Sequence, residues 1–472
     1  MHEQHYAETK IIQDQLTKMT QAWALRRPFA AEQARQLREE ALLLNHAHYL
    51  AQIPIYQKLA QEEAIGELTN IESIKQHLMS TDDLFKSYPA RWLDEGEFGQ
   101  MNGWLSQIHH RRIDVDVTDI HTIDAWLKRL ESVDVKLVYS SGTSGVFSFV
   151  ARDSQNWALT KRFNTCYLLP LLAYAKLGAA WQQRAIATAT RLLSPDQFVN
   201  IIQKISGAQH FDGVFLDFQN GRTGMQSIGR ELGPIFQRRY FLYQTELTAT
   251  VLRVLSRGAR MGEERQQLAM LQEDTIGQKE QNFARLVAQM QQSTAAGQQV
   301  FIFGAPFQCK ALCEYIVQTN QTLQLKPGSL VLFGGGWKSF QGEKIGRDAL
   351  VMLMTQSFGL PAERIIEGYS MTEANIFMVR CDHGRFHIPP MLEPVIFDEA
   401  LTPMTGKTLH GVFGFLDPLA TAYPGFIITG DVVRLVEGEC ACGLTGPAIT
   451  EIERAQNREI KGCAGVMASV RA

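Results

Sequence analysis

The sequence predicts an α/β fold with layered α/β subdomains and a helical N-terminal region. Three observations predict it: strand and helix patterns alternate between Gln299 and Asp431, two strand patterns flank a short polar loop near residue 140, and residues 1–125 have helical spacing. Alternating strands and helices are typical of a largely parallel sheet with helices on its faces. A chain of 472 residues is long enough for two or three cooperating domains.

The N-terminal region is expected to be mainly helical over residues 1–125. Ala30–Tyr49 is rich in Ala, Leu, Glu, Gln and Arg at helical spacing, and Leu68–Met79 continues that character. An α/β core over residues 126–435 and a short C-terminal segment over residues 436–472 complete the predicted division of the chain.

The core begins near Asp134, where the pattern changes from helix to strand. Val135–Tyr139 and Phe147–Val150 predict two strands, and Asp153 with Ser154 can cap a helix that starts there. The long glutamine-rich segment Phe241–Gln298 is expected to be helical, as a hairpin of helices between two sheet regions. The further expected elements are the strands Val300–Phe303, Leu330–Phe333 and Arg364–Glu367 and the helices Gln308–Thr319 and Gly342–Phe358.

The charge balance argues against a nucleic-acid or anionic-membrane partner, because 46 Lys and Arg nearly match 49 Asp and Glu. The basic run His109–Arg112 is expected to be a solvated loop. Cys166–Trp181 is apolar, but it carries Lys176 and is too short for a membrane span, so a buried helix is expected. The N-terminus lacks an export signal pattern, and seven cysteines do not suggest a disulfide framework. We therefore expect a cytoplasmic protein that acts on a small molecule.

The segment between the two predicted strands has the composition of a phosphate-binding loop. Glycines allow the backbone to fold closely around an anion, while hydroxyls and successive N–H groups donate hydrogen bonds to phosphate oxygens. A hairpin turn of small residues is the alternative interpretation. The residues of this loop are Ser140, Ser141, Gly142, Thr143, Ser144 and Gly145.

Three further motifs follow this loop in a fixed order: Phe333–Lys338, Gly368–Glu373 and Thr429–Asp431. With Tyr139–Gly145, they resemble the core motifs of the adenylate-forming enzymes, which include acyl-CoA synthetases, luciferases and peptide-synthetase adenylation domains. The resemblance covers Asp134–Lys461. It implies the large-domain fold of these enzymes, with a truncated or absent C-terminal mobile domain.

The resemblance also implies ATP and Mg²⁺ as ligands. Tyr369 would stack on adenine, Thr372 would contact the α-phosphate, and Glu373 would bind the Mg²⁺ that neutralises the developing charge. Asp431 and Arg454 would contact the ribose. The other implied ligand-binding residues are Ser140, Ser141, Thr143 and Ser144, which would hold the phosphates, and Gly334, Gly335 and Gly336, which would lie against the adenine or the acyl pocket.

One departure and two motifs favour one branch of this superfamily. Val146–Ser148, and then Arg152 and Asp153, follow the loop where many members have Pro-Lys, and the motifs Phe333–Lys338 and Asp83–Lys86 accompany this departure. Together they resemble the acyl-protein synthetases, of which the synthetase subunit of the bioluminescence fatty-acid reductase is one, and which are related to phenylacetate-CoA ligase-like enzymes. By this resemblance Lys461 lies in the hinge region and Cys463 accepts the acyl group. Lys461 and Arg458 would lower the pKa of that thiol. An ordinary free cysteine near the terminus is the alternative.

A second group of cysteines has metal-ligand spacing. Cys381 and His387 are followed at a distance by the pair Cys440 and Cys442, and three thiolates with one imidazole can complete a tetrahedral zinc shell. Several phenylacetate-CoA-ligase-like enzymes resemble this arrangement. His383 is a competing ligand, and buried cysteines with a surface histidine are the alternative. A closed shell of this kind is structural.

The sequence therefore predicts an enzyme that activates a carboxylic acid with MgATP and transfers the acyl group first to Cys463 and then to a partner protein, either a reductase or a carrier. One alternative is an acyl- or aryl-CoA ligase of the phenylacetate type, in which CoA takes the acyl group. A second alternative is a non-catalytic scaffold with the adenylating fold. The acid is not revealed, although aromatic residues suggest that Phe215–Tyr243, Phe333 and Trp337 line its pocket.

Overall fold

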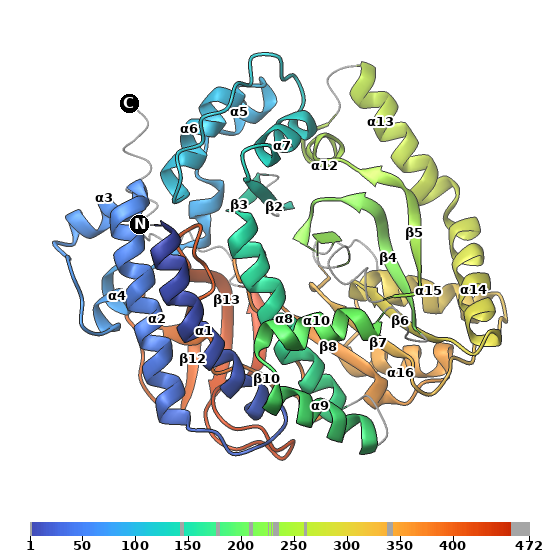
Figure 1. Ribbon diagram of the computed structural model, residues 1–472. Coiled ribbons are helices and arrows are strands. Elements are labelled where there is room, and N and C mark those ends of the chain that lie inside the picture. Colours follow the sequence, from blue (N-terminus) through green and yellow to red (C-terminus); the bar gives the residue numbers. More distant parts are fainter. Residues whose placement is uncertain are drawn as a thin grey trace.

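The computed structural model has the α/β architecture that the sequence predicts (Figure 1). The structure describes residues 2–141, 146–175, 180–206, 211–224, 226–227, 229, 236–258, 262–337 and 343–454. Within these residues, helices pack around two sheets and a short hairpin. No helix in this described part of the chain is long and apolar enough to cross a membrane.

The N-terminal region is mainly helical, as predicted. The prediction for Ala30–Tyr49 is confirmed by α2, whereas Leu68–Met79 is helical only at its centre, in α4. The elements are α1 (His2–Ala24), α2 (Ala31–Gln52), α3 (Pro54–Glu62), α4 (Glu72–His77), β1 (Ser80–Thr81), the 3₁₀ turn η1 (Asp82–Lys86), α5 (Ala90–Asp94), α6 (Phe98–Ile108) and α7 (Ile123–Glu131).

The predicted hairpin and its following helix are present. β2 (Lys136–Ser141) pairs antiparallel with β3 (Phe147–Arg152), so that Ser140 lies opposite Ser148. The carboxylate of Asp153 then accepts a hydrogen bond from the backbone N–H of Asn156 at 2.7 Å, which caps α8 (Ser154–Ala175). The helices α9 (Ala180–Leu192) and α10 (Pro195–Ser206) follow.

The first sheet has the strand order β5-β4-β6-β7-β8-β9, and all pairs are parallel except β8 with β9. The three predicted strands of this region are confirmed as β6, β7 and β8. The strands are β4 (Phe211–Gly221), β5 (Arg238–Leu247), β6 (Gln299–Gly304), β7 (Leu330–Gly334), β8 (Ile365–Tyr369) and β9 (Met378–Val379). Their buried faces pack against α14 (Lys279–Ala295), α15 (Pro306–Gln318) and α16 (Arg347–Phe358).

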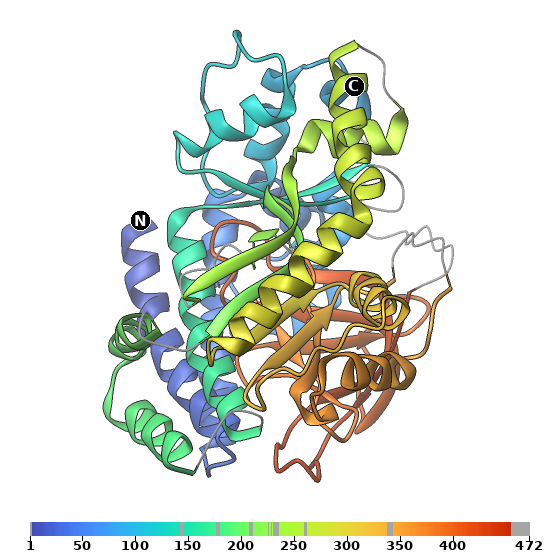
Figure 2. The ribbon, with the colours of Figure 1, turned by 90° about the vertical axis from the view of Figure 1, so that its right-hand side faces the viewer.

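The prediction that Phe241–Gln298 is helical is confirmed from Ala249 onward, but its start and the expected hairpin arrangement were wrong. The segment begins as strand β5, because Tyr240, Phe241, Tyr243 and Thr245 favour extended backbone and β4 supplies hydrogen-bond partners. Its helices α12 (Ala249–Arg257) and α13 (Gly262–Gln272) lead through a π-helical turn, η3 (Glu273–Gly277), into α14. Figure 2 shows α13 and α14 following one another beside the sheet, not folding back as a hairpin.

The second sheet contains the C-terminal strands in the order β10-β14-β13-β12-β11, with antiparallel pairing. Strand β1 from the N-terminal region joins it, parallel to β13. The strands are β10 (Phe386–His387), β11 (Glu393–Phe397), β12 (Thr408–Leu416), β13 (Phe426–Val436) and β14 (Ala448–Arg454). The continuous apolar core of this sheet includes residues of the hairpin and of α6, α7 and α8.

The basic run His109–Arg112 is not the solvated loop that was expected, because His109 and His110 are buried. His110 shares a hydrogen bond with Asp153 at 2.9 Å, and its backbone N–H donates to the carbonyl of Ala422 at 3.0 Å. Burial lowers the pKa of His109 to about 3. Asp153 at the start of α8 and the loop at Ala422 contact His110, and composition alone does not reveal these contacts.

Candidate active site

The turn Thr372–Glu373 follows β8 and lies beside the β2–β3 hairpin. The Glu373 side chain is buried, and one of its carboxylate oxygens accepts a hydrogen bond from the Ser148 hydroxyl at 2.7 Å. Since Ser148 lies opposite Ser140, the hairpin meets this carboxylate close to the predicted phosphate loop. Gly142, Thr143, Ser144, Gly145 and the side chain of Ser141 lie outside the described residues.

Tyr369, Asp431 and Arg454 form a second group of predicted site residues. The Tyr369 hydroxyl donates to one oxygen of Asp431 at 2.7 Å, and the Arg454 guanidinium donates to the other at 3.0 Å. The register of β13 and β14 places Asp431 directly opposite Arg454. Burial, together with the Asp431 charge, raises the pKa of Tyr369 well above its usual range, so that its hydroxyl stays a donor. The carboxylate is therefore held at a fixed place with a fixed orientation.

The two groups face a common region. The Glu373 carboxylate interacts electrostatically with Tyr369 and with Arg454, which both contact Asp431. Residues far apart in the sequence thus contribute to one polar cluster: Ser148 from the hairpin, Glu373 from the turn after β8, and Asp431 from β13. The structure brings together the predicted residues that it describes on these three segments.

A carboxylate from the N-terminal region also reaches this place, and sequence reasoning missed it. The pairing of β1 with β13 sets Asp82 beside Gly430: its carboxylate lies 3.9 Å from the point where a Cβ on Gly430 would be, and the Arg454 guanidinium carbon lies 4.0 Å from the same point. Burial raises the pKa of Asp82 to about 6, with the negative charges of Glu373 and Asp83 adding to the effect. The adjacent motif Asp83–Lys86 was the only signal in the sequence.

The raised pKa of Asp82 predicts a pH-dependent stability. The pKa of Asp82 is about 6 in the folded protein, against an ordinary value of 3.8. The folded state therefore binds this proton more tightly than the unfolded state does. The stability gained in this way is fully present below about pH 4 and is lost as the pH rises through 6. Asp82→Asn should therefore be more stable than wild type at pH 8 without Mg²⁺, by up to about 3 kcal/mol.

Denaturant unfolding of both chains between pH 5 and pH 8 measures this difference. Asp348→Asn is the control, because the Asp348 side chain lies on α16 and is 96% exposed. A difference between Asp82→Asn and wild type that stays constant over this pH range would contradict the assignment.

The glycines Gly334, Gly335 and Gly336 lie where β7 ends, near the start of the turn. A Cβ on Gly334 would meet the carbonyl oxygen of Gly368 at 2.5 Å, so only glycine permits this close approach of β7 to β8. Gly335 and Gly336 have φ values of 87° and 64° and are exposed, and a Cβ at either position would touch no neighbouring atom. Their backbone is accessible to a ligand, as the predicted role requires.

The predicted zinc ligands lie together in a second cluster, made by the turn before β10, by β10 itself and by the loop between β13 and β14. Ligand atoms of Cys381, His387, Cys440 and Cys442 all lie within 4.8 Å of one another. The Cys381 and Cys440 sulfurs are 3.9 Å apart, and the Cys442 sulfur is 3.3 Å from Nε2 of His387. Four ligands of a tetrahedral zinc ion are roughly 3.4–3.8 Å apart. The donor set and its spacing fit zinc.

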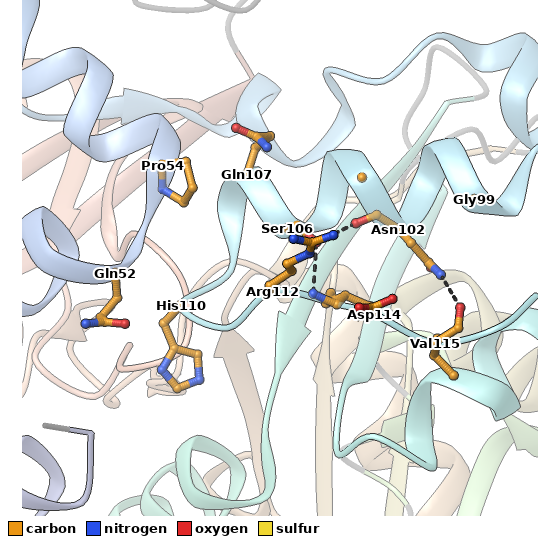
Figure 3. Close-up of a pocket in the computed structure, with 12 residues that line it drawn as sticks. Gln52, Pro54, Gly99, Asn102, Ser106, Gln107, His110, Arg112, Asp114 and Val115 are labelled. Carbon is orange, nitrogen blue, oxygen red and sulfur yellow. Dashed lines mark hydrogen bonds between the residues drawn. The ribbon is translucent and has the colours of Figure 1, made fainter.

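A separate cleft of about 670 Å³ opens beside α6, lined in part by Gln52, Asn102, Gln107 and His110 (Figure 3). None of its lining residues is a predicted site residue. The predicted residues Lys461 and Cys463 lie outside the part of the chain that the structure describes.

The fold of the described residues, with two sheets and a hairpin that contacts the turn after β8, is similar to that of adenylate-forming enzymes. A crystal structure of 2-hydroxyisobutyryl-CoA ligase with 2-HIB-AMP and CoA, in the thioesterification state, matches 92% of this chain and 70% of that chain, with a TM-score of 0.54 and 10% identity. An open conformation of the same ligase matches 91% and 71%, with a TM-score of 0.50 and 10% identity. The predicted fold class is confirmed.

The sequence matches show which proteins this chain resembles. Residues 270–471 match the family described as acyl-protein synthetase, LuxE. Two relatives are named long-chain-fatty-acid–luciferin-component ligase: one from Vibrio harveyi, 28% identical over 197 residues, covers 40% of this chain and 50% of the relative, and one from Aliivibrio fischeri, 28% identical over 205 residues, covers 42% and 53%. This chain spans about half the length of these relatives. The predicted resemblance to the acyl-protein synthetases is confirmed.

Proposed function

We propose that this chain activates a carboxylic acid with MgATP to an acyl-adenylate and then transfers the acyl group to a cysteine and onward to a partner. The observation that carries the proposal is the meeting of Glu373, Tyr369, Asp431 and Arg454 next to the hairpin that ends at Ser140. Glu373 would bind the metal and Asp431 would bind the ribose, and the neighbouring hairpin carries the predicted phosphate loop. Activation of an acid with ATP needs these three kinds of contact.

In the first step an oxygen of the acid attacks the α-phosphorus of ATP, and the bond from that phosphorus to the bridging oxygen breaks, so that pyrophosphate leaves. Mg²⁺ at Glu373 would neutralise negative charge in the transition state. The nearby Asp82 carboxylate would offer a second oxygen ligand of the kind that Mg²⁺ prefers. Asp431, oriented by Tyr369 and Arg454, would accept hydrogen bonds from the ribose hydroxyls. The protein therefore acts mainly by positioning and charge stabilisation.

In the second step the thiolate of Cys463 would attack the acyl carbon, and AMP would leave as the thioester forms. The acyl group would then pass to a reductase or carrier protein. The names of the relatives make long-chain fatty acids the first substrates to test. Cys381, Cys440 and Cys442 form no disulfide in the structure, which agrees with a reducing, cytoplasmic setting.

Pyrophosphate release over a panel of fatty, aromatic and amino acids tests the first step. We expect strong ATP-dependent release with a long-chain fatty acid. A chain that neither releases pyrophosphate with any acid nor gains thermal stability from MgATP would instead support the non-catalytic scaffold.

Cys463→Ala tests the second step. The variant should still release pyrophosphate, but it should no longer carry radiolabelled acyl groups after denaturing electrophoresis. Met467→Ala in the same segment is the control and should remain acylated. Unchanged acyl-CoA formation by Cys463→Ala, when CoA is supplied, would favour the CoA ligase and leave Cys463 without a role.

For the cysteine cluster we propose a structural zinc ion bound by Cys381, His387, Cys440 and Cys442. It would hold the turn before β10 against the loop that follows β13. The end of α1 also packs on this cluster, since the Trp23 ring lies 6.4 Å from that of His387 and the Trp23 indole donates to the carbonyl of Thr445 at 2.8 Å. Zinc would thus connect the N-terminal helix to the C-terminal sheet.

A further inference from the structure

A buried arginine without a predicted role in the site holds the backbone of the Thr372–Glu373 turn. Arg152 is the last residue of β3, and only 2% of its surface is exposed. Its Nη2 donates to the carbonyl oxygens of Thr372 at 2.8 Å and of Ala374 at 3.3 Å. The carbonyl of Glu373, which lies between them, accepts a hydrogen bond from the Tyr423 hydroxyl at 3.0 Å. Three successive carbonyl groups are therefore held by one cation and one hydroxyl.

The guanidinium itself is fixed by a second set of contacts. Its Nε donates to the side-chain oxygen of Asn375 at 3.1 Å, and its Nη2 also contacts the Tyr423 hydroxyl at 3.2 Å. The amide of Asn375 donates at 3.0 Å to Asp417, which is fully buried and supplies the opposite charge. A planar fork of donors suits these divergent acceptors, and a lysine ammonium does not.

These contacts decide which part of the turn an incoming anion meets. Since the C=O and N–H of a trans peptide point in opposite directions, the Thr372–Glu373 peptide directs its N–H away from Arg152. The negative ends of the peptide dipoles at Thr372, Glu373 and Ala374 are occupied by Arg152 and Tyr423, so they cannot repel a phosphate that approaches the turn from the opposite side.

We propose that Arg152, with Tyr423, is the positioning residue that shapes the Thr372–Glu373 turn for the α-phosphate and the metal; this inference rests on the proposed function. Arg152 contacts the turn through its carbonyl oxygens and acts on the reaction only through the geometry of Glu373 and Thr372. Without it, the carbonyl groups would be free to rotate, and Glu373 would lose its fixed orientation. Misplacement by about 1 Å can cost a hundredfold in rate.

The test compares Arg152→Lys with wild type in acid-dependent pyrophosphate release over a range of Mg²⁺ concentrations. We expect kcat to fall by about 10- to 100-fold and half-maximal activity to need more Mg²⁺, while KM for the acid changes little. Arg253→Lys is the matched control: Arg253 is also buried, and it pairs with Asp94 at 2.8 Å outside the polar cluster. This substitution should lower the melting temperature and leave kcat and the Mg²⁺ dependence unchanged.

Tyr423→Phe provides a second variant that keeps the ring packing and removes only the hydroxyl. It should shift the Mg²⁺ dependence in the same direction as Arg152→Lys, by a smaller factor. Wild-type kcat and Mg²⁺ dependence in Tyr423→Phe, and in Arg152→Lys if it folds, would overturn the inference. If wild type itself releases no pyrophosphate with any acid, the proposed function fails, and this outcome is distinct from failure of the positioning role.

Discussion

Glu373→Gln is expected to reduce acid-dependent pyrophosphate release by about 10²–10³-fold, because the transition state loses the negative group that would hold Mg²⁺. Glutamine is nearly isosteric and can still accept the hydrogen bond from Ser148, so the fold should be preserved. Steady-state kinetics at saturating ATP measure the loss, and it should appear in kcat more than in KM for the acid.

Glu393→Gln is the matched control for this variant. Glu393 is also a mostly buried carboxylate, with ion pairs to Arg38 and to Lys75, but it lies on β11 away from the polar cluster. Its substitution should lower the free energy of unfolding and leave the rate unchanged. Equal kinetic losses in both variants would mean that Glu373 contributes through stability alone.

Loss of the zinc cluster is expected to have the largest effect on stability. Wild type purified under reducing conditions should contain close to one zinc ion per chain, and Cys442→Ser should contain much less. A ligand that binds only the folded state stabilises it by about 4 kcal/mol when the ligand concentration is a thousand times its Kd. Removal of zinc by a chelator should therefore lower the free energy of unfolding by an amount of this order.

Cys313→Ser separates this effect from the general cost of changing a buried cysteine. Cys313 is fully buried in α15, outside the cluster, so its substitution should lower stability without changing the zinc content. Metal analysis of the three proteins, combined with denaturant unfolding, provides the measurement. Wild type without zinc, with the same unfolding curve before and after chelation, would show that the four residues form an ordinary buried cluster.

The elements that the sequence predicted best are those with a strong local signal. Strands β6, β7 and β8 are short runs of apolar residues bounded by turn residues, and α2 has a clear helical spacing, so local preference and tertiary structure agree. Strand β5 was missed because the glutamine-rich composition of the following helices was extended backward over it. Its extended form depends on pairing with β4, and a single sequence does not show that pairing.

The candidate site was predictable in part for a similar reason. Glu373, Tyr369 and Asp431 lie in short motifs that can be read one at a time, and the structure brings them together. The positions of Asp82 and Arg152 at this site could not be found in that way. Asp82 reaches the polar cluster through the β1–β13 pairing, and Arg152 contacts a turn 220 residues further along the chain. Such contacts are properties of the fold, and no local pattern of residues marks them.

We propose that one site binds MgATP and an acid and joins them through the α-phosphate. Mass spectrometry of the Cys463→Ala chain, quenched after incubation with MgATP and a long-chain fatty acid, tests it most directly. We expect an acyl-AMP that accumulates in proportion to enzyme, together with pyrophosphate, and that forms about 10²–10³-fold more slowly when Glu373→Gln is combined with Cys463→Ala. Formation of ADP and an acyl phosphate, or no acid-dependent change in ATP, would contradict it.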